Sequence, residues 1–202
     1  AAPTQSDEES FERRKREYEI LATSIAATEE LPCVTQDSAE IALLANIGLP
    51  EELAGVAEHN LAGAGLFRTE FLFLESHERP TFQLQAEIYE GMARGLGDLP
   101  LVIRTFDLGG DKLPPFLLSE GPETLASLHL RGLRVSLSER SLLDTQLHAI
   151  LHVAQTADVR ILFPMVIGSD DFARAVSAVD RIGDQFGLLR RPPIGAMIET
   201  PA

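Results

Sequence analysis

The chain has 202 residues, 45% of them hydrophobic, and a formal net charge of -14. This length suffices for one sizeable core, and the acidic balance argues against nucleic acid or an anionic membrane as the main partner. No apolar run approaches the roughly 20 residues of a membrane span, so no membrane insertion is expected. The single cysteine, Cys33, rules out an internal disulfide and is typical of a protein from the reducing cytoplasm.

The first predicted element is a helix over residues 6–30. Ser6 and Glu9 have the spacing of a capping box, and acidic residues fill the first turn, where the helix dipole favours them. Apolar residues recur at helical spacing on one face: Phe11, Tyr18, Leu21 and Ile25. Because Pro32 ends this helix, residues 1–32 are predicted to form a helical linker before a domain over residues 33–202.

From residue 40 onward, short apolar strands alternate with amphipathic helices. Strands are predicted at residues 40–46, 65–69, 101–106, 160–166 and 194–198. Between them, helices are predicted over residues 50–60, around the apolar positions of residues 82–96 and 143–154, and from residue 169 onward. Such alternation is typical of a parallel sheet covered by helices. The pattern fits an α/β fold, a partial (β/α)8 barrel of the TIM type with about five β/α units. It fits a doubly wound sheet nearly as well.

Two of the predicted strands end in arginine followed by threonine, at Arg68 and at Arg104. An unpaired guanidinium group is costly to bury. Two such strands therefore indicate two arginines that converge on one anion, which the guanidinium fork grips through parallel hydrogen bonds. The alternative is a pair of structural ion pairs, Arg68 with Glu70 and Arg104 with Asp107.

The interval between the third and fourth strands is almost two β/α units long, and the extra residues lie between Gly109 and Arg140. In a barrel this connection lies at the carboxyl ends of the strands, where active sites are built. A long connection at that position is predicted to be a lid or a binding loop.

The segments GAGLFRTEFLFL, VIRTFDLGGDK and IGAMIETPA, in this order, resemble the phosphoenolpyruvate-binding barrel of enzyme I. This is the phosphoenolpyruvate-protein phosphotransferase of the bacterial sugar phosphotransferase system. The resemblance extends over nearly the whole chain and implies a barrel truncated after its fifth strand. It further implies that phosphoenolpyruvate is the substrate, with transfer of its phosphoryl group to a histidine on an absent amino-terminal domain and then to HPr. Mg²⁺ as cofactor, a homodimer at full length and a cytoplasmic location are implied as well.

The resemblance also assigns roles to four residues. Arg68, Arg104 and Arg131 match arginines that hold the phosphate of the substrate, and Glu199 matches a glutamate that binds Mg²⁺, a cation that prefers carboxylate oxygens. The segment over residues 124–130 departs from the family, which has Asn-Pro and then Gly before the third arginine. No catalytic residue is assigned. Without the family's phosphohistidine, second metal ligand and cysteine acid, the chain alone is expected to transfer no phosphoryl group.

Two other interpretations remain open. The first is the barrel of a pyruvate phosphate dikinase or phosphoenolpyruvate synthase, which would keep this pocket and join a nucleotide-binding domain. The second is a non-catalytic regulatory or dimerisation module that keeps the fold, and the altered segment before Arg131 favours it.

Overall fold

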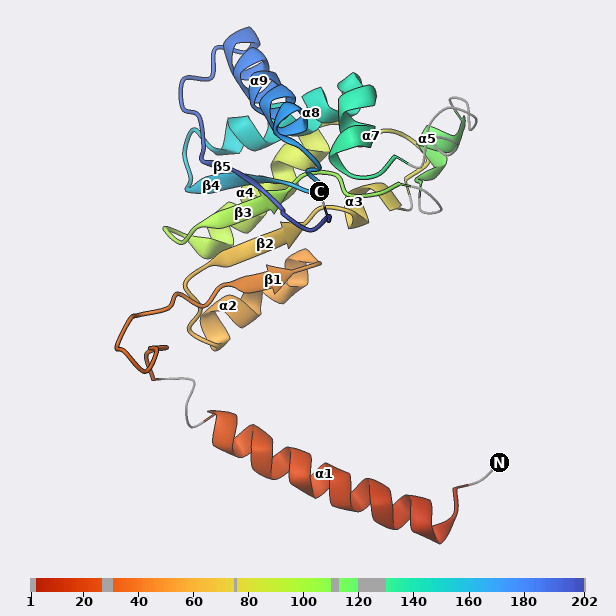
Figure 1. Cartoon of the computed structure of the whole chain (residues 1–202), viewed down its shortest axis with the longest axis vertical. Helices are drawn as coiled ribbons and strands as arrows, with labels where there is room; N and C mark the ends of the chain where they lie inside the picture. Colours follow the sequence, from red (N-terminus) through yellow and green to blue (C-terminus); the bar gives the residue numbers. More distant parts are fainter. Residues whose placement is uncertain (1–2, 27–30, 75, 110–112, 120–129, 202) are drawn as a thin grey trace.

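A computed structural model describes residues 3–26, 31–74, 76–109, 113–119 and 130–201. Its centre is a parallel sheet of five strands, whose order in space equals their order in the chain (Figure 1). The strands are β1 (Ala45–Ile47), β2 (Ala64–Arg68), β3 (Leu101–Arg104), β4 (Val159–Phe163) and β5 (Ile194–Ala196). The predicted α/β class is confirmed. A doubly wound sheet reverses its strand order at a switch point, and the described strands contain no reversal, so that alternative is wrong for them.

Helices that follow successive strands lie side by side along the sheet (Figure 1). Helix α4 packs against η1 and against α8, and α8 packs against α9, as expected of consecutive β/α units. None of the described helices is both long and apolar enough to cross a membrane. The helices are α1 (Gln5–Ala26), η1 (Pro50–Leu53, a 3₁₀ helix), α2 (Ala54–Glu58), α3 (Phe71–Leu74), α4 (Phe82–Leu96), α5 (Pro115–Ser119), α7 (Leu133–Ser138), α8 (Arg140–Val153) and α9 (Ser169–Gln185).

The hydrophobic core lies between the sheet and this layer of helices. The predicted stripe on α4 is buried from Ala86 to Leu96, and Leu143 and Leu147 of α8 are fully buried. Burial of one large apolar side chain stabilises a fold by about 1.5–3 kcal/mol, so the core favours this arrangement strongly. Its largest fully buried side chains are Tyr89, Phe67, Phe73, Phe106, Phe163, Ile47, Met92, Leu101, Ile103, Leu133, Leu143 and Leu147.

Helix α1 begins at Gln5 and is capped by Thr4 rather than by the predicted Ser6. The Thr4 amide and hydroxyl donate to Asp7 Oδ2 at 2.9 and 2.7 Å, and the Asp7 amide donates back to Thr4 Oγ1 at 3.3 Å. The predicted capping box is therefore wrong, because Thr4 and Asp7 already satisfy the first free amides of the helix. The helix stands apart from the sheet in Figure 1, and Phe11 and Tyr18 on its apolar face are exposed.

Several predicted elements differ at their ends. Strand β1 begins at Ala45 rather than at residue 40, and Ile41 and Leu43 before it are exposed. The predicted helix over residues 50–60 is a 3₁₀ turn followed by the short α2. Strands β3, β4 and β5 end at Arg104, Phe163 and Ala196, so the residues predicted to extend them form loops at the carboxyl edge of the sheet instead.

Candidate functional site

Arg68 and Arg104 occupy equivalent positions at the carboxyl ends of β2 and β3. The two residues are register partners across this parallel pair, and Leu162 of β4 is the next partner along the same line. Neighbouring strands lie about 4.8 Å apart, so the backbone brings both arginines to the same edge of the sheet. The prediction that two arginine-tipped strands lie side by side is confirmed.

The side chains of Arg68 and Arg104 nevertheless lie in different surroundings in this structure, and the predicted convergence of their guanidinium groups on one anion stays a prediction. Arg68 is exposed, and its guanidinium group lies against Gly48, just after β1, where a side-chain carbon would collide with it. Hydrogen bonds from the Gly48 and Leu49 amides lower the pKa of the nearby Glu52, and the charge of Arg68 lowers it further. The side chain of Arg68 therefore points toward the end of β1.

Arg104 is held between two carboxylates. Its Nη2 lies 3.0 Å from Glu70 Oε1 and its Nη1 lies 3.2 Å from Asp107 Oδ2. Only 13% of the Arg104 side chain is exposed, and the Glu70 and Asp107 side chains are 13% and 5% exposed. The alternative ion pair of Arg104 with Asp107 is thus present, whereas Glu70 pairs with Arg104 rather than with Arg68.

Arg131 reaches this cluster through Asp107. Its Nε donates to Asp107 Oδ1 at 3.4 Å, and its backbone forms an isolated antiparallel bridge with Gly109. Burial raises the pKa of Asp107; Arg104 and Arg131 lower it in part, and the charge of Glu199 raises it further. Three of the four predicted site residues therefore influence the carboxylate of Asp107, which the sequence suggested only as the alternative ion-pair partner of Arg104.

Glu199 lies in the segment after β5 and is tied to the segment after β4. Its Oε1 accepts a hydrogen bond from the Met165 amide at 2.8 Å, and Thr200 Oγ1 donates to the Val166 carbonyl at 3.4 Å. Within the described ranges, no three His, Cys, Asp or Glu residues form a group that could hold a metal ion. A Mg²⁺ ion can rely on one or two carboxylates with substrate and water oxygens, and Glu199 fits as one such ligand.

Gln146 of α8 is a central residue of the site that the sequence reasoning missed. It is fully buried, and its Oε1 accepts from the Phe106 amide at 2.9 Å. Its Nε2 donates to Thr69 Oγ1 at 3.1 Å and to the Tyr89 hydroxyl at 3.2 Å. Thr69 Oγ1 in turn donates to the carbonyl of Arg104 at 2.9 Å. One amide side chain therefore ties the ends of β2 and β3 to each other and to α4 and α8.

A signal for Gln146 was present in the sequence. The residue follows Leu143 by one turn and precedes Ile150 by one turn, so it occupies the apolar stripe of its helix. A polar residue in such a stripe must find buried hydrogen-bond partners. Those partners come from three other elements, and only the fold brings them together.

Buried polar atoms without a hydrogen-bond partner gather at the same edge of the sheet. In the described part of the chain they are Glu70 Oε1, Arg104 Nε and Thr105 Oγ1. Glu70 Oε1 lies close to Arg104 Nη2, but the contact has the geometry of an ion pair and not of a hydrogen bond. Such unsatisfied groups are rare in native cores and call for a functional explanation. Here they mark the edge of the sheet that carries the predicted arginines.

Gly109 allows the segment that carries Arg131 to approach the end of β3. A side-chain carbon at Gly109 would meet the Leu130 carbonyl and would lie 2.6 Å from Arg131 Cα. Because both obstacles are backbone atoms, replacing Gly109 with alanine is expected to push the segment away and to lower the free energy of unfolding by about 1–3 kcal/mol. Urea titration would measure this change.

A matched control is available in α4. A side-chain carbon at Gly91 would meet nothing within 4 Å, and alanine in an exposed helix position stabilises by about 0.5–1 kcal/mol. The free energy of unfolding is therefore expected to fall in Gly109→Ala and to rise in Gly91→Ala. Equal stability of Gly109→Ala and the wild type would show that the close approach has no energetic weight.

The long interval between β3 and β4 is only partly described. Its described portions contain α5 and α7, so it is not a structureless loop throughout. Residues 110–112 and 120–129, which include Lys112 and most of the segment that departs from the family, lie outside the described residues. The prediction of a lid or binding loop stays a prediction.

Residues 23–202 match the family described as PEP-utilising enzyme, PEP-binding domain. The chain is 34% identical over 206 residues to the phosphoenolpyruvate-protein phosphotransferase of Latilactobacillus sakei, covering 96% of this chain and 33% of that protein. The proteins of the same name from Enterococcus faecalis and Lactococcus lactis are 33% and 34% identical, with 99% of this chain and 36% of each relative covered.

The chain thus spans about a third of the length of these curated relatives. All three are named as phosphotransferases, so the dikinase or synthase alternative is not favoured. The resemblance inferred from the three sequence segments is confirmed, since the family match includes all of them. The chain belongs to the family of phosphoenolpyruvate-utilising enzymes, as their phosphoenolpyruvate-binding domain.

Proposed function

We propose that this chain forms the first five β/α units of a TIM-type barrel that binds phosphoenolpyruvate in a phosphoenolpyruvate-protein phosphotransferase. The sequential strand order and the adjacent helices support the barrel. In this proposal the phosphoryl group passes to a histidine on another domain and then to HPr, for sugar uptake in the cytoplasm. The complete protein is a homodimer, as the family resemblance implies.

The observation that carries the proposal is the register of Arg68 with Arg104 at the carboxyl edge of the sheet. Arg131 adjoins them through Asp107. In the proposed complex these three arginines bind the phosphate of the substrate, because a guanidinium fork matches phosphate oxygens in charge and geometry. The exposed Arg68 is free to turn from Gly48 toward Arg104, since its side chain is long and solvent surrounds it.

The carboxylates of Glu70 and Asp107 have a defined part in this proposal. They hold Arg104 in place while no substrate is bound, and their negative charge opposes a second anion. A phosphate group carries more charge than either carboxylate and offers three oxygens, so it can engage Arg68 and Arg131 while Arg104 keeps its pairs. The unsatisfied Arg104 Nε supplies one further donor.

Glu199 is proposed as a ligand of Mg²⁺, which when bound would offset the charge that develops on the substrate oxygens. Glu199 raises the pKa of Asp107, so the two carboxylates act on each other electrostatically. A cation beside Glu199 would reduce this repulsion. The arginines and Glu199 would then bind opposite charges of one substrate–metal complex.

The test is the affinity of Arg68→Ala for phosphoenolpyruvate in the presence of Mg²⁺. A charge-assisted hydrogen-bonding group contributes about 1.5–3 kcal/mol, so the affinity is expected to fall by roughly 10- to 150-fold. Stability should change by less than about 0.5 kcal/mol, because Arg68 is exposed. Titration of protein labelled with ¹⁵N at arginine side chains, followed by NMR, detects binding even where the affinity is weak.

Arg94→Ala is the control, since Arg94 is an exposed arginine of α4 away from the strand ends. Its affinity for phosphoenolpyruvate should equal that of the wild type. If Arg68→Ala bound phosphoenolpyruvate as tightly as Arg94→Ala, the substrate-binding role of Arg68 would be contradicted.

A further inference from the structure

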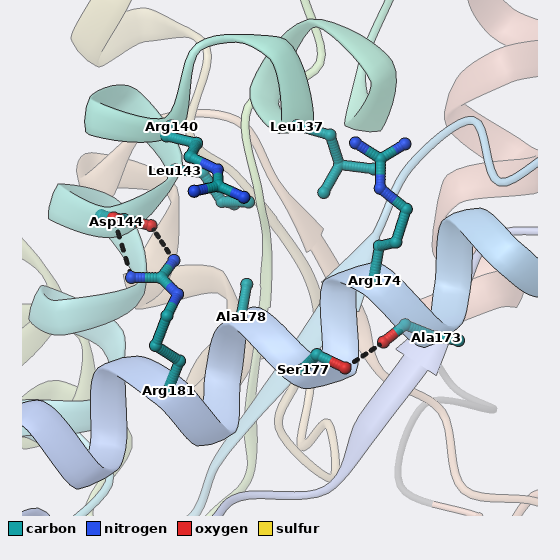
Figure 2. A pocket seen from close by; sticks show the side chains of 9 residues that line it. All are labelled: Leu137, Arg140, Leu143, Asp144, Ala173, Arg174, Ser177, Ala178 and Arg181. Carbon is teal, nitrogen blue, oxygen red and sulfur yellow. Dashed lines mark hydrogen bonds and ion pairs between the residues drawn. The ribbon is translucent and has the colours of Figure 1, made fainter.

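A second group of arginines surrounds a cavity in the helical layer, away from the strand ends. The cavity is open to the surface, has a volume of about 390 Å³ and lies where α7 and α8 meet α9, and its three arginines are exposed. Figure 2 shows its lining, in which Arg140 comes from α8 and Arg174 and Arg181 come from α9. Three guanidinium groups at one cavity are unexpected in a chain with a net charge of -14.

The charge of the lining is strongly positive. Its only carboxylate is that of Asp144, which accepts two hydrogen bonds from Arg181, at 3.0 and 2.5 Å. The guanidinium groups of Arg140 and Arg174 form no hydrogen bond or ion pair with another residue of the described ranges. The described lining therefore carries a formal charge of +2, and two of its arginines form no ion pair with a carboxylate of the described residues.

The positions of these arginines are not explained by the stability of the helices. Arg140 is the first residue of α8, where the helix dipole disfavours a positive charge. Arg174 extends from α9 toward Leu137 of α7, across the cavity (Figure 2). Arg174 is exposed there, so water solvates its charge and a surface ion pair does not account for its position.

The remaining lining has the composition of a small-molecule site. Its apolar part consists of Leu137, Leu143, Ala173 and Ala178, and Ser177 adds a hydroxyl group. Sites for small organic ligands commonly have volumes of about 300–1,000 Å³, apolar walls and a few polar groups that fix orientation. This cavity combines such walls with groups that bind phosphate in a forked geometry.

We propose that this cavity binds a small organic phosphate at a site separate from the strand-end arginines. Arg140 and Arg174 bind the phosphate oxygens, Arg181 stays paired with Asp144 at the side of the site, and the apolar residues contact the organic part. The proposal is independent of the role assigned to Arg68 and Arg104, because it uses other residues on another face of the fold.

The test uses inorganic pyrophosphate as probe and the double variant Arg140→Gln with Arg174→Gln. Its affinity for pyrophosphate is expected to be at least about tenfold lower than that of the wild type, since two charge-assisted contacts are lost. The control, Arg94→Gln with Arg160→Gln, removes the same charge from exposed positions elsewhere and should change the affinity less than about twofold. Isothermal titration calorimetry measures all three proteins.

Two further variants separate this site from the strand-end arginines and from effects on folding. Because pyrophosphate can also bind the strand-end arginines, the loss of affinity on removal of Arg140 and Arg174 should be the same when Arg68 is replaced by alanine. Asp144→Asn should raise the affinity severalfold, because it removes the only negative charge of the lining, and a folding defect would not produce such a gain. Equal losses in the two double variants, no binding by the wild type, or no gain in Asp144→Asn would each overturn the proposal.

Discussion

Replacing Arg104 with alanine is expected to lower the free energy of unfolding by about 3–5 kcal/mol at neutral pH. Arg104 is the positive partner of both Glu70 and Asp107, at 3.0 and 3.2 Å. Without it, two nearly buried carboxylates face each other, and Asp107 keeps only the longer contact with Arg131. Urea denaturation of the variant and of the wild type measures the difference.

The loss of stability in Arg104→Ala should depend on pH. Burial already raises the pKa of Asp107 and the charge of Arg104 lowers it in part, so removal of Arg104 should raise the pKa of Asp107 further. The folded variant then binds protons more tightly than its unfolded state, so its stability falls as the pH rises above about 4. The deficit relative to the wild type should therefore be smaller at pH 4 than at pH 7.

Arg160 provides the control for Arg104. It pairs with Asp158 at 3.0 Å, but its side chain is 44% exposed, and surface pairs contribute only about 0–1 kcal/mol. A loss of the same size in Arg160→Ala and Arg104→Ala would show that burial of the strand-end pair is unimportant. A deficit of Arg104→Ala that grew toward acid pH would contradict the assigned ionic contacts.

Replacing Gln146 with leucine is expected to lower the free energy of unfolding by about 2–4 kcal/mol. The change leaves the Phe106 amide without its partner and removes one hydrogen bond each from Thr69 and Tyr89. A buried polar group that loses its partner costs about 1–3 kcal/mol. The hydroxyl groups keep one hydrogen bond each, so the amide accounts for the larger share.

Gln155 is a matched control for Gln146. Its side chain also makes three hydrogen bonds, to the Leu151 carbonyl and to the carbonyl and amide of Arg190. It is only partly buried, so water can replace those contacts and Gln155→Leu should lose less than about 1.5 kcal/mol. If both variants lost the same stability, the network around Gln146 would be no stronger than a surface contact.

The network of Gln146 also bears on the proposed substrate site. It fixes the backbone around Arg104, through Thr69 just after β2 and Phe106 after β3. Arginines that bind one anion must be held in place by residues whose own positions are fixed. A buried amide from α8 meets this requirement, which explains a polar residue inside an apolar stripe.

The strands that carry Arg68 and Arg104 lie side by side, but their side chains point to different partners, and this difference shows how far sequence reasoning extends. Apolar runs that each end in arginine were enough to predict two buried parallel strands. Their order in the sheet was not fixed by the pattern, which fitted a barrel and a doubly wound sheet nearly equally well. The directions of the guanidinium groups do not follow from it. Arg68 turns toward Gly48 and Arg104 toward its carboxylates because long side chains respond to whatever charges the fold places nearby.

The amino-acid sequence by itself determined the α/β class, the positions of the strands and the family, because these depend on local periodicity and on contiguous motifs. Only the tertiary structure decided that Asp107 joins Arg104 to Arg131, that Gln146 ties the strand ends together, and that arginines from two helices share one cavity. The partners in each case are separated by many residues in the chain. Their contacts depend on how the elements pack, and no local pattern records that.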